Sequence, residues 1–498
     1  MAAQDGLTAL SAVELRRRMG ARELSPVELL EACIARIERL NPGVNAIAAT
    51  AYVRARQEAR AAEAAVLRGE PLGLLHGLPI GIKDLEETAG LLTTFGSPLY
   101  RDYVPDSDSS MVARVRAAGA IVTAKTNTPE FGAGANTRNA VWGATGNPFN
   151  PALMAGGSSG GSAAALACDL LPLCSGTDTG GSLRIPAALC GVVGFRPSAG
   201  LVGADRRSLG WQPISVIGPM GRTVADTCLL LAAQAAMDDR DPLSYPVDGP
   251  TFATPEPVDL GTLRVAWTED FGACPVDPTI RQVFRGRIDA MRHLFRSCDE
   301  AAFDLGDAHR CFDVIRALNF VDRFRELYEK DPAALGPNVR ANYETGARLS
   351  LADVAWAQAE QTRLFRAFQR TFRDYDLVLS PAVAVTPFPW TQSHLTELEG
   401  KPLLNYYHWL ALTYVITLAT NPTVALPCGV DHAGMPFGLQ VIGRFRGDRA
   451  VLGAAQAMEQ AFGAIPALRR PRSEPHRWTE PVPALKSIVT HPPRMADA

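Results

Sequence analysis

The sequence predicts an α/β fold in which a partly antiparallel sheet is layered with helices. Helical patterns alternate with short apolar runs along most of the 498 residues, and this alternation is typical of such layered folds. Two apolar runs, 423–426 and 438–442, lie so close in sequence that we expect them to pair antiparallel. Hydrophobic residues make up 47% of the chain, enough to bury a large core, which excludes wholesale disorder.

Three helices are predicted before the first strand. Ser11-Ala-Val-Glu14 and Ser25-Pro-Val-Glu28 both have the spacing of a capping box, and the second has proline at the first helical position. We expect this second helix to end near Leu40, before Asn41-Pro-Gly43. The third helix, rich in Ala, Arg and Glu, is predicted from about Thr50 to Leu67.

The later elements follow from apolar periodicity and from the positions of Gly and Pro. An apolar segment, Trp409–Ala419, is too short to span a bilayer and indicates a core helix. The other predicted helices are 108–118, 161–168, 223–237, 279–295, 448–462 and several within 308–375, and the predicted strands are 78–84, 120–124, 171–176, 263–267, 377–380, 423–426 and 438–442.

The net charge and the cysteine spacing argue against a nucleic-acid-binding, membrane-binding or zinc-binding protein. Forty-nine basic and 52 acidic residues give a net charge of −3, so no global field recruits nucleic acid or an anionic membrane. The nine cysteines form no CxxC pair and no zinc-type spacing, which favours buried thiols in a reducing compartment and no metal or other cofactor. No signal peptide is visible, so we expect a cytoplasmic protein.

Two glycine-rich segments carry serines: Gly156-Gly-Ser-Ser-Gly-Gly-Ser162 and Gly176-Thr-Asp-Thr-Gly-Gly-Ser-Leu-Arg-Ile-Pro186. A phosphate cradle is disfavoured because GxxxxGK[ST] and GxGxxG are both missing there. A Ser-His-Asp hydrolase matches GxSxG formally, but no strand precedes the serine and the only nearby histidine is His76. A third interpretation is a serine nucleophile activated by lysine, for which the chain offers Lys83, Ser158 and Ser182.

Lys83 is one of only five lysines and lies in the apolar run Gly77–Leu85. As a base it must be neutral, whereas at a reference pKa near 10.4 only about one lysine in 2,500 is neutral at pH 7. Burial of this run would lower the pKa of Lys83. Neighbouring Asp84 would oppose that shift, but adjacent side chains of a strand face opposite sides, so we expect Asp84 to point away.

On these residues the chain resembles the amidase signature family of serine hydrolases. The long segment from Gly156 to Pro186 is specific, and the resemblance covers most of the chain. The matching segments are Gly77–Leu85, Lys125–Phe131, Gly156–Pro186, Gly191–Pro197, Gly218–Asp226, Asn421–Pro427 and Gly434–Gly443.

The resemblance implies a large mixed β-sheet covered by helices on both faces. It implies a single domain over residues 1–480, with a signature core at about 75–230, a helical pocket-forming segment at about 300–410, and a C-terminal tail at 481–498.

The resemblance also implies roles for individual residues. Lys83 is the general base, Ser158 the bridging serine on a cis peptide bond, and Ser182 the nucleophile. Backbone amides of Thr179, Gly180, Gly181 and Ser182 form the oxyanion hole, while Asp178, Arg184 and Ser159 support the loops.

Aromatic residues are the candidates for the substrate pocket. Trp142, Trp390 and Tyr407 are predicted to line it, and such rings suit an apolar or aryl acyl group. The alternative is that these rings fill the core, where aromatic side chains are common.

Two functions are compatible with the resemblance. The first is a stand-alone hydrolase that cleaves the C–N bond of a small-molecule carboxylic amide, or of a related carbamate or aryl amide, through an acyl-enzyme. The second is a glutaminase similar to the amidotransferase subunits of this family, which works with partner chains on aminoacyl-tRNA. The balanced charge favours the first, without nucleic acid or membrane as a partner. Homodimerisation is compatible with these observations.

Overall fold

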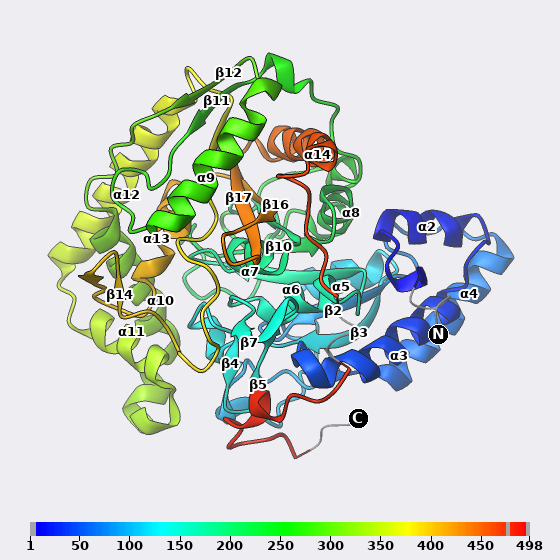
Figure 1. Ribbon diagram of the computed structural model, residues 1–498. Coiled ribbons are helices and arrows are strands. Elements are labelled where there is room, and N and C mark those ends of the chain that lie inside the picture. Colours follow the sequence, from blue (N-terminus) through cyan, green and yellow to red (C-terminus); the bar gives the residue numbers. More distant parts are fainter. Residues whose placement is uncertain (1–5, 475–478, 495–498) are drawn as a thin grey trace.

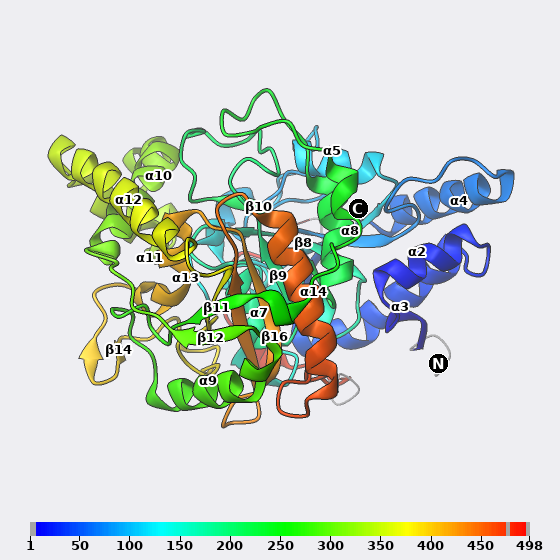
Figure 2. The same cartoon turned by 90° about the horizontal axis from the view of Figure 1, so that it is seen from above.

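The computed structural model describes residues 6–474 and 479–494. Eleven strands form one mixed sheet that runs through the molecule, with helices on both sides of it (Figures 1 and 2), so the predicted fold class is confirmed. In spatial order the strands are β1 (Ile47–Thr50), β3 (Ile121–Thr126), β2 (Pro79–Lys83), β8 (Leu173–Asp178), β10 (Val216–Gly221), β9 (Val193–Arg196), β16 (Thr423–Val430), β17 (Pro436–Ile442), β13 (Leu377–Pro381), β11 (Arg264–Trp267) and β12 (Ser297–Glu300).

This sheet combines parallel and antiparallel pairs. β2 pairs in parallel with both β3 and β8, and β11 pairs in parallel with β12 and β13. The middle of the sheet is antiparallel, and it includes the predicted pairing of β16 with β17. The carboxyl ends of β2 and β8 therefore lie at the same edge, where Lys83 and Asp178 end their strands.

Helices pack on both the sheet and one another. α8 packs on β10, α14 on β16, α6 on β8 and α7 on β17. A separate group of helices, α10 to α13, lies together at one side of the molecule (Figure 2). The helices are α2 (Ala12–Gly20), α3 (Pro26–Val44), α4 (Tyr52–Arg68), α5 (Ser110–Ala117), α6 (Gly160–Ala167), α7 (Arg184–Cys190), α8 (Val224–Gln234), α9 (Pro278–Met291), α10 (Ala308–Lys330), α11 (Pro337–Ala347), α12 (Leu351–Thr371), α13 (Ala411–Ala419) and α14 (Asp448–Ala464).

The helix starts predicted from serine caps are confirmed, but one helix end is not. The side chains of Ser11 and Ser25 both accept hydrogen bonds from backbone amides in the first turn. α3 continues through Pro42 and ends at Val44, four residues beyond the predicted end at Leu40. The Asn45 amide donates to the Asn41 carbonyl from a left-handed conformation, which completes the last turn despite the proline.

Four strands of the large sheet and one helix were not predicted from the sequence. β1, β9 and β12 have only four residues each, and β10 contains two glycines and a proline, residues that weaken a strand pattern. In β10, Gly218 is needed because a Cβ there would overlap the Phe195 carbonyl and the Leu183 side chain. The unpredicted helix is α7, a short helix that carries Pro186 within its first turn.

The cysteines are buried, as predicted. All nine lie in the described part of the chain, and they form no disulfide there. Among the described helices, none combines the length and the apolarity needed to cross a bilayer.

Gly161, in the first turn of α6, holds this helix against the ends of β1 and β3. Its amide donates to the Asn127 carbonyl, and the Asn127 amide donates to the Ala46 carbonyl. A Cβ at Gly161 would lie 2.6 Å from the Ala46 carbonyl oxygen and overlap the Asn127 backbone.

We therefore expect Gly161→Ala to destabilise the protein, because backbone atoms cannot yield as a flexible side chain can. Overpacking of this kind costs about 1–3 kcal/mol. Gly286→Ala is the matched control. Gly286 lies within α9, and nothing comes within 4 Å of an added Cβ. Because alanine favours a helix more than glycine does, this variant should raise the free energy of unfolding by about 0.5–1 kcal/mol. Urea unfolding monitored by circular dichroism measures both changes, and equal midpoints for the two variants would contradict this packing argument.

Candidate active site

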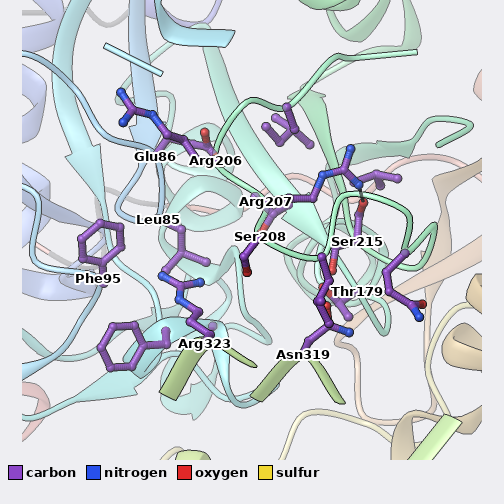
Figure 3. A pocket seen from close by; sticks show the side chains of 18 of the residues that line it. Leu85, Glu86, Phe95, Thr179, Arg206, Arg207, Ser208, Ser215, Asn319 and Arg323 are labelled. Carbon is purple, nitrogen blue, oxygen red and sulfur yellow. Dashed lines mark hydrogen bonds between the residues drawn. The ribbon is translucent and has the colours of Figure 1, made fainter. Parts of the chain in front are cut away.

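A cavity of about 420 Å³ opens beside the carboxyl ends of β2 and β8 (Figure 3). Its polar residues include Ser158, Ser182, Thr177, Thr179 and Ser215, which come from both glycine-rich segments and from the start of β10. Aromatic and charged side chains stand out in the rest of the lining: Phe95, Phe131, Phe320, Phe324, Arg206, Arg207, Arg316, Arg323, Glu86, Glu87 and Asp205. The cavity therefore has a hydroxyl-rich part and a wall in which aromatic rings lie beside charges of both signs.

Lys83 ends β2 with its side chain fully buried. Its Nζ lies 2.8 Å from each of three hydroxyl oxygens, Ser158 Oγ, Ser159 Oγ and Thr177 Oγ1. The Lys83 amide donates to Ser175 Oγ, which fixes the backbone of the last strand residue. If the Lys83 side chain rotated away from Ser158, its buried Nζ would lose these hydrogen bonds without water to replace them, so the side chain is held in this position.

The surroundings of Lys83 favour its neutral form. Burial lowers the pKa of Lys83 to about 7, although the carboxylates of Asp178 and Glu86 oppose the shift. Asp84 points elsewhere, as predicted: its carboxylate accepts from Thr94 and lies 3.9 Å from Lys125. At pH 7 the free amine of Lys83 is therefore far more populated than that of an ordinary lysine.

The first glycine-rich segment brings Ser158 to the lysine. The Gly157–Ser158 peptide bond is cis, as the family resemblance implied. Directly after it, Ser159 contacts both Lys83 and the second segment, because its amide donates to the Ser182 carbonyl at 3.3 Å. This bond joins the two serine segments at the cavity, where Ser158 and Ser182 are both lining residues.

The loop that carries Ser182 is held by a buried ionic network. Asp178 accepts from the amides of Gly181 and Leu183 and forms two hydrogen bonds with the Arg184 guanidinium, at 2.9 and 3.0 Å. Arg196 bonds the same carboxylate. Burial opposes ionisation of Asp178, but the two guanidinium groups outweigh it and hold its pKa well below the usual range.

Backbone donors near Ser182 divide into two kinds. The amide of Gly181, one of the four predicted oxyanion donors, already donates to Asp178 at 2.9 Å. The amides of Gly180 and Ser182 donate to no acceptor among residues 6–474 and 479–494. The Thr179 amide likewise donates to no acceptor in the described part of the chain, while the Thr179 side chain bonds Ser215. Thr179, Gly180 and Ser182 are thus the predicted amides available to an incoming oxygen.

The three aromatic residues predicted to line the pocket lie outside the lining of this cavity. Trp142 donates from Nε1 to Thr94, Trp390 is packed in the core, and the Tyr407 hydroxyl donates to Asp313 at 2.6 Å. Sequence analysis did not identify the phenylalanines that take their place. One sequence signal could have indicated part of this wall. Five lining residues have the i, i+3, i+4, i+7, i+8 spacing that puts them on one face of α10: Arg316, Asn319, Phe320, Arg323 and Phe324.

The Ser-His-Asp alternative finds no support in the geometry. His76 contacts the Ala62 carbonyl and does not line the cavity, so it is not placed to serve either serine. Within the described part of the chain, no group of three or more His, Cys, Asp and Glu side chains is arranged to hold a metal ion.

Comparison with known proteins identifies the family. The model of the Amidase family matches residues 28–452. An acylamidase of Rhodococcus erythropolis is 35% identical over 453 residues, with 90% of this chain and 95% of that protein covered. A glutamyl-tRNA(Gln) amidotransferase subunit of Acaryochloris marina is 33% identical over 473 residues, which cover 90% of this chain and 97% of that protein.

Solved structures show the same likeness. A bacterial aryl acylamidase of the amidase signature family has a TM-score of 0.84 at 26% identity, with 96% of this chain and 98% of that chain covered. A 6-aminohexanoate cyclic dimer hydrolase has a TM-score of 0.80 at 28% identity, with 93% and 99% covered. This chain therefore belongs to the amidase signature family and is an amide-hydrolysing enzyme.

Proposed function

We propose that the enzyme hydrolyses a small-molecule carboxylic amide through an acyl-enzyme on Ser182, with Lys83 as the base and Ser158 as the proton relay. One observation carries this proposal. A fully buried lysine whose pKa is about 7 contacts Ser158 at 2.8 Å, and Ser158 shares a cavity with a second serine beside free backbone amides.

The reaction begins with neutral Lys83. Lys83 takes the Ser158 hydroxyl proton while Ser158 takes that of Ser182, and Ser182 Oγ attacks the amide carbonyl carbon. The resulting oxyanion accepts hydrogen bonds from the amides of Gly180 and Ser182. As the C–N bond breaks, the proton returns through Ser158 to the leaving amine.

Hydrolysis of the ester repeats these steps with water. Water attacks the acyl carbon, its proton passes to Lys83, and Ser182 regains a proton as the carboxylic acid leaves. Each proton that Lys83 receives is therefore returned within one turnover, and the enzyme ends in its starting state.

The wall of the cavity supports an apolar or aryl group on the substrate. Phe95, Phe131, Phe320 and Phe324 all contribute to the lining, and aromatic walls favour such groups. The names of two similar proteins, an acylamidase and an aryl acylamidase, agree with this preference.

Ser182→Ala should abolish the acyl-enzyme, because no other side chain is placed to replace the nucleophile. We expect a loss of at least about 10³-fold in kcat/KM, the range seen when such nucleophiles are removed. A fluorophosphonate probe should label the Ser182 peptide of the wild type, as mass spectrometry of a digest shows. Ser393→Ala, which removes an exposed serine, is the control and should retain full activity and labelling. Wild-type labelling in Ser182→Ala would refute the assignment.

The pH dependence of kcat/KM should follow the protonation of Lys83. Burial lowers the pKa of Lys83 to about 7, and only the free amine accepts a proton, so the rate should rise with pH through an apparent pKa near 7. Lys83→Arg keeps the charge but cannot act as a base, so single-turnover acylation should fall by about 10²–10⁴-fold. The control Lys330→Arg alters an exposed lysine and should leave the profile intact. A rate for Lys83→Arg near that of wild type would exclude lysine as the base.

A glutaminase that works with partner chains on aminoacyl-tRNA is the second candidate, because the amidotransferase subunit of Acaryochloris marina is 33% identical to this chain. The net charge of −3 favours the stand-alone hydrolase, which would need no nucleic acid.

We therefore expect the isolated protein to release amine from anilides and to bind transfer RNA no more tightly than an acidic control protein. Anilide hydrolysis assays and filter-binding titrations at low salt measure the two quantities. Glutaminase activity that appears only with partner chains, together with tRNA binding that weakens with salt, would reverse the ranking. Size-exclusion chromatography of the same preparation measures whether the protein is a monomer or a homodimer.

A further inference from the structure

One face of α10 presents arginines to the cavity. Arg316, Asn319 and Arg323 are spaced by three and four residues, so they lie on the same side of the helix, and all three line the cavity. Figure 3 shows Arg323 reaching from α10 toward Leu85, with the ring of Phe95 to one side. Arg316 is buried and Arg323 is exposed to water, so α10 presents to the cavity one desolvated cation and one that a ligand can reach.

Three of the four arginines in the lining already have partners. Arg206 forms ion pairs with Glu87 and Asp205, and Arg207 pairs with Asp241. Arg316 donates to Asn342 and to the Tyr406 hydroxyl. These bonds position the three side chains, although Arg207 Nε is buried without a hydrogen-bond partner in the described chain.

Arg323 differs from the other three because it has no hydrogen bond or ion pair with any residue of the described chain. Its guanidinium carbon lies 5.9, 5.4 and 5.4 Å from the ring centroids of Phe95, Phe131 and Phe324. Water reaches the side chain, yet enough protein surrounds it that desolvation lowers the pKa of Arg323. It remains a cation at neutral pH, with its donors directed into the cavity.

Nearby carboxylates limit which anion can bind there. Glu87 is engaged by Arg206 and by the Tyr103 hydroxyl, and Glu86 accepts from Ser109 while burial raises its pKa. Both glutamates line the same cavity. A phosphate dianion would meet their repulsion with a single free guanidinium to offset it, whereas a carboxylate monoanion matches one guanidinium in charge and shape.

The cation lies in the same cavity as the reacting serines. Phe131 contacts the Arg323 guanidinium, and the next residue, Gly132, comes so close to Ser158 that a Cβ there would lie 3.3 Å from its Oγ. The same segment thus contacts the cation on one side and the bridging serine on the other.

We propose that Arg323 binds a carboxylate that the substrate carries at a distance from the scissile amide, so that the enzyme prefers acidic amides to neutral ones of similar size. Arg323 would then be a specificity-determining residue, and the phenylalanines around it would pack the apolar part between the two functional groups. This inference rests on the proposed amide hydrolysis at Ser182.

Two matched pairs of amides test the preference. Glutaryl 4-nitroanilide and pentanoyl 4-nitroanilide differ by a carboxylate on the acyl half, and 4-acetamidobenzoate and acetanilide differ by one on the amine half. In at least one pair we expect the acidic member to have a kcat/KM at least about 10-fold higher, as one charged hydrogen bond contributes. Arg323→Met should bring the ratio of kcat/KM between the acidic and the neutral member close to 1, and Arg323→Lys should restore part of this ratio.

The control variant is Arg325→Met, on the same helix but outside the cavity lining, which should behave as wild type. The proposal is overturned if the wild type prefers the neutral member of both pairs, or if Arg323→Met leaves the ratio unchanged.

Binding without turnover separates the two proposals. Calorimetric titration of Ser182→Ala, which lacks the proposed nucleophile, should show tighter binding of glutaric acid monoamide than of pentanamide, and the double variant Ser182→Ala/Arg323→Met should bind the two equally. If acid-selective binding is present but none of the four amides is cleaved, the proposed hydrolysis fails and the Arg323 site stands. If the amides are cleaved without acid selectivity, the hydrolysis stands and the Arg323 site fails.

Discussion

Desolvation of the Lys83 amine is the physical constraint on which the rest of the site depends. β2 lies between β3 and β8, so a side chain at its last residue has no route to bulk water, and Nζ must find its partners among protein hydroxyls. Those hydroxyls come from the segment before α6 and from β8, and both are therefore drawn to one point. The same burial that fixes the geometry also lowers the pKa into the range where an amine can accept a proton at neutral pH.

A second buried charge, Asp178, holds the other half of the site. Its carboxylate bonds two amides of the Ser182 loop and two arginines, and Arg184 in turn donates to the Thr413 carbonyl and to Gln440. These contacts join β8, α7, α13 and β17 around a loop of glycines that has little stiffness of its own. Buried ion pairs of this kind add little net stability, but removing one partner costs about 3–5 kcal/mol. The network is thus better explained as a device that fixes loop geometry than as a source of stability.

Sequence reasoning identified the elements whose patterns are local. The serine caps, β2, α6, β8 and the antiparallel β16–β17 pair follow from periodicity and end signals, and the residues around Lys83 were recognisable from a long, specific motif. What it missed depends on tertiary contacts. β10 is a strand although Gly218 and Pro219 weaken its sequence pattern. Glycine is required at 218 because Phe195 and Leu183 leave no room for a larger residue, and these neighbours are brought there only by the fold. The choice of aromatic lining residues depends on tertiary contacts too. Sequence alone does not distinguish Trp390 and Tyr407, which lie outside the cavity lining, from Phe131 and Phe324, which belong to it, because packing decides which rings face the cavity.

The proposed reaction chemistry and the proposed substrate recognition lie on separate parts of this fold. Lys83, Ser158 and Ser182 come from the sheet and from the segments leading into α6 and α7. One face of α10, more than 130 residues beyond Ser182 along the chain, adds five residues to the cavity lining: Arg316, Asn319, Phe320, Arg323 and Phe324. α10 packs on α11, α12 and α13, so its cavity face can change side chains without disturbing the buried lysine. An aryl acylamidase and a 6-aminohexanoate cyclic dimer hydrolase share this architecture, with TM-scores of 0.84 and 0.80. In this chain the cavity face of α10 carries two arginines, Arg316 and Arg323. Within the described part of the chain, Arg316 has hydrogen-bond partners and Arg323 has neither a hydrogen bond nor an ion pair.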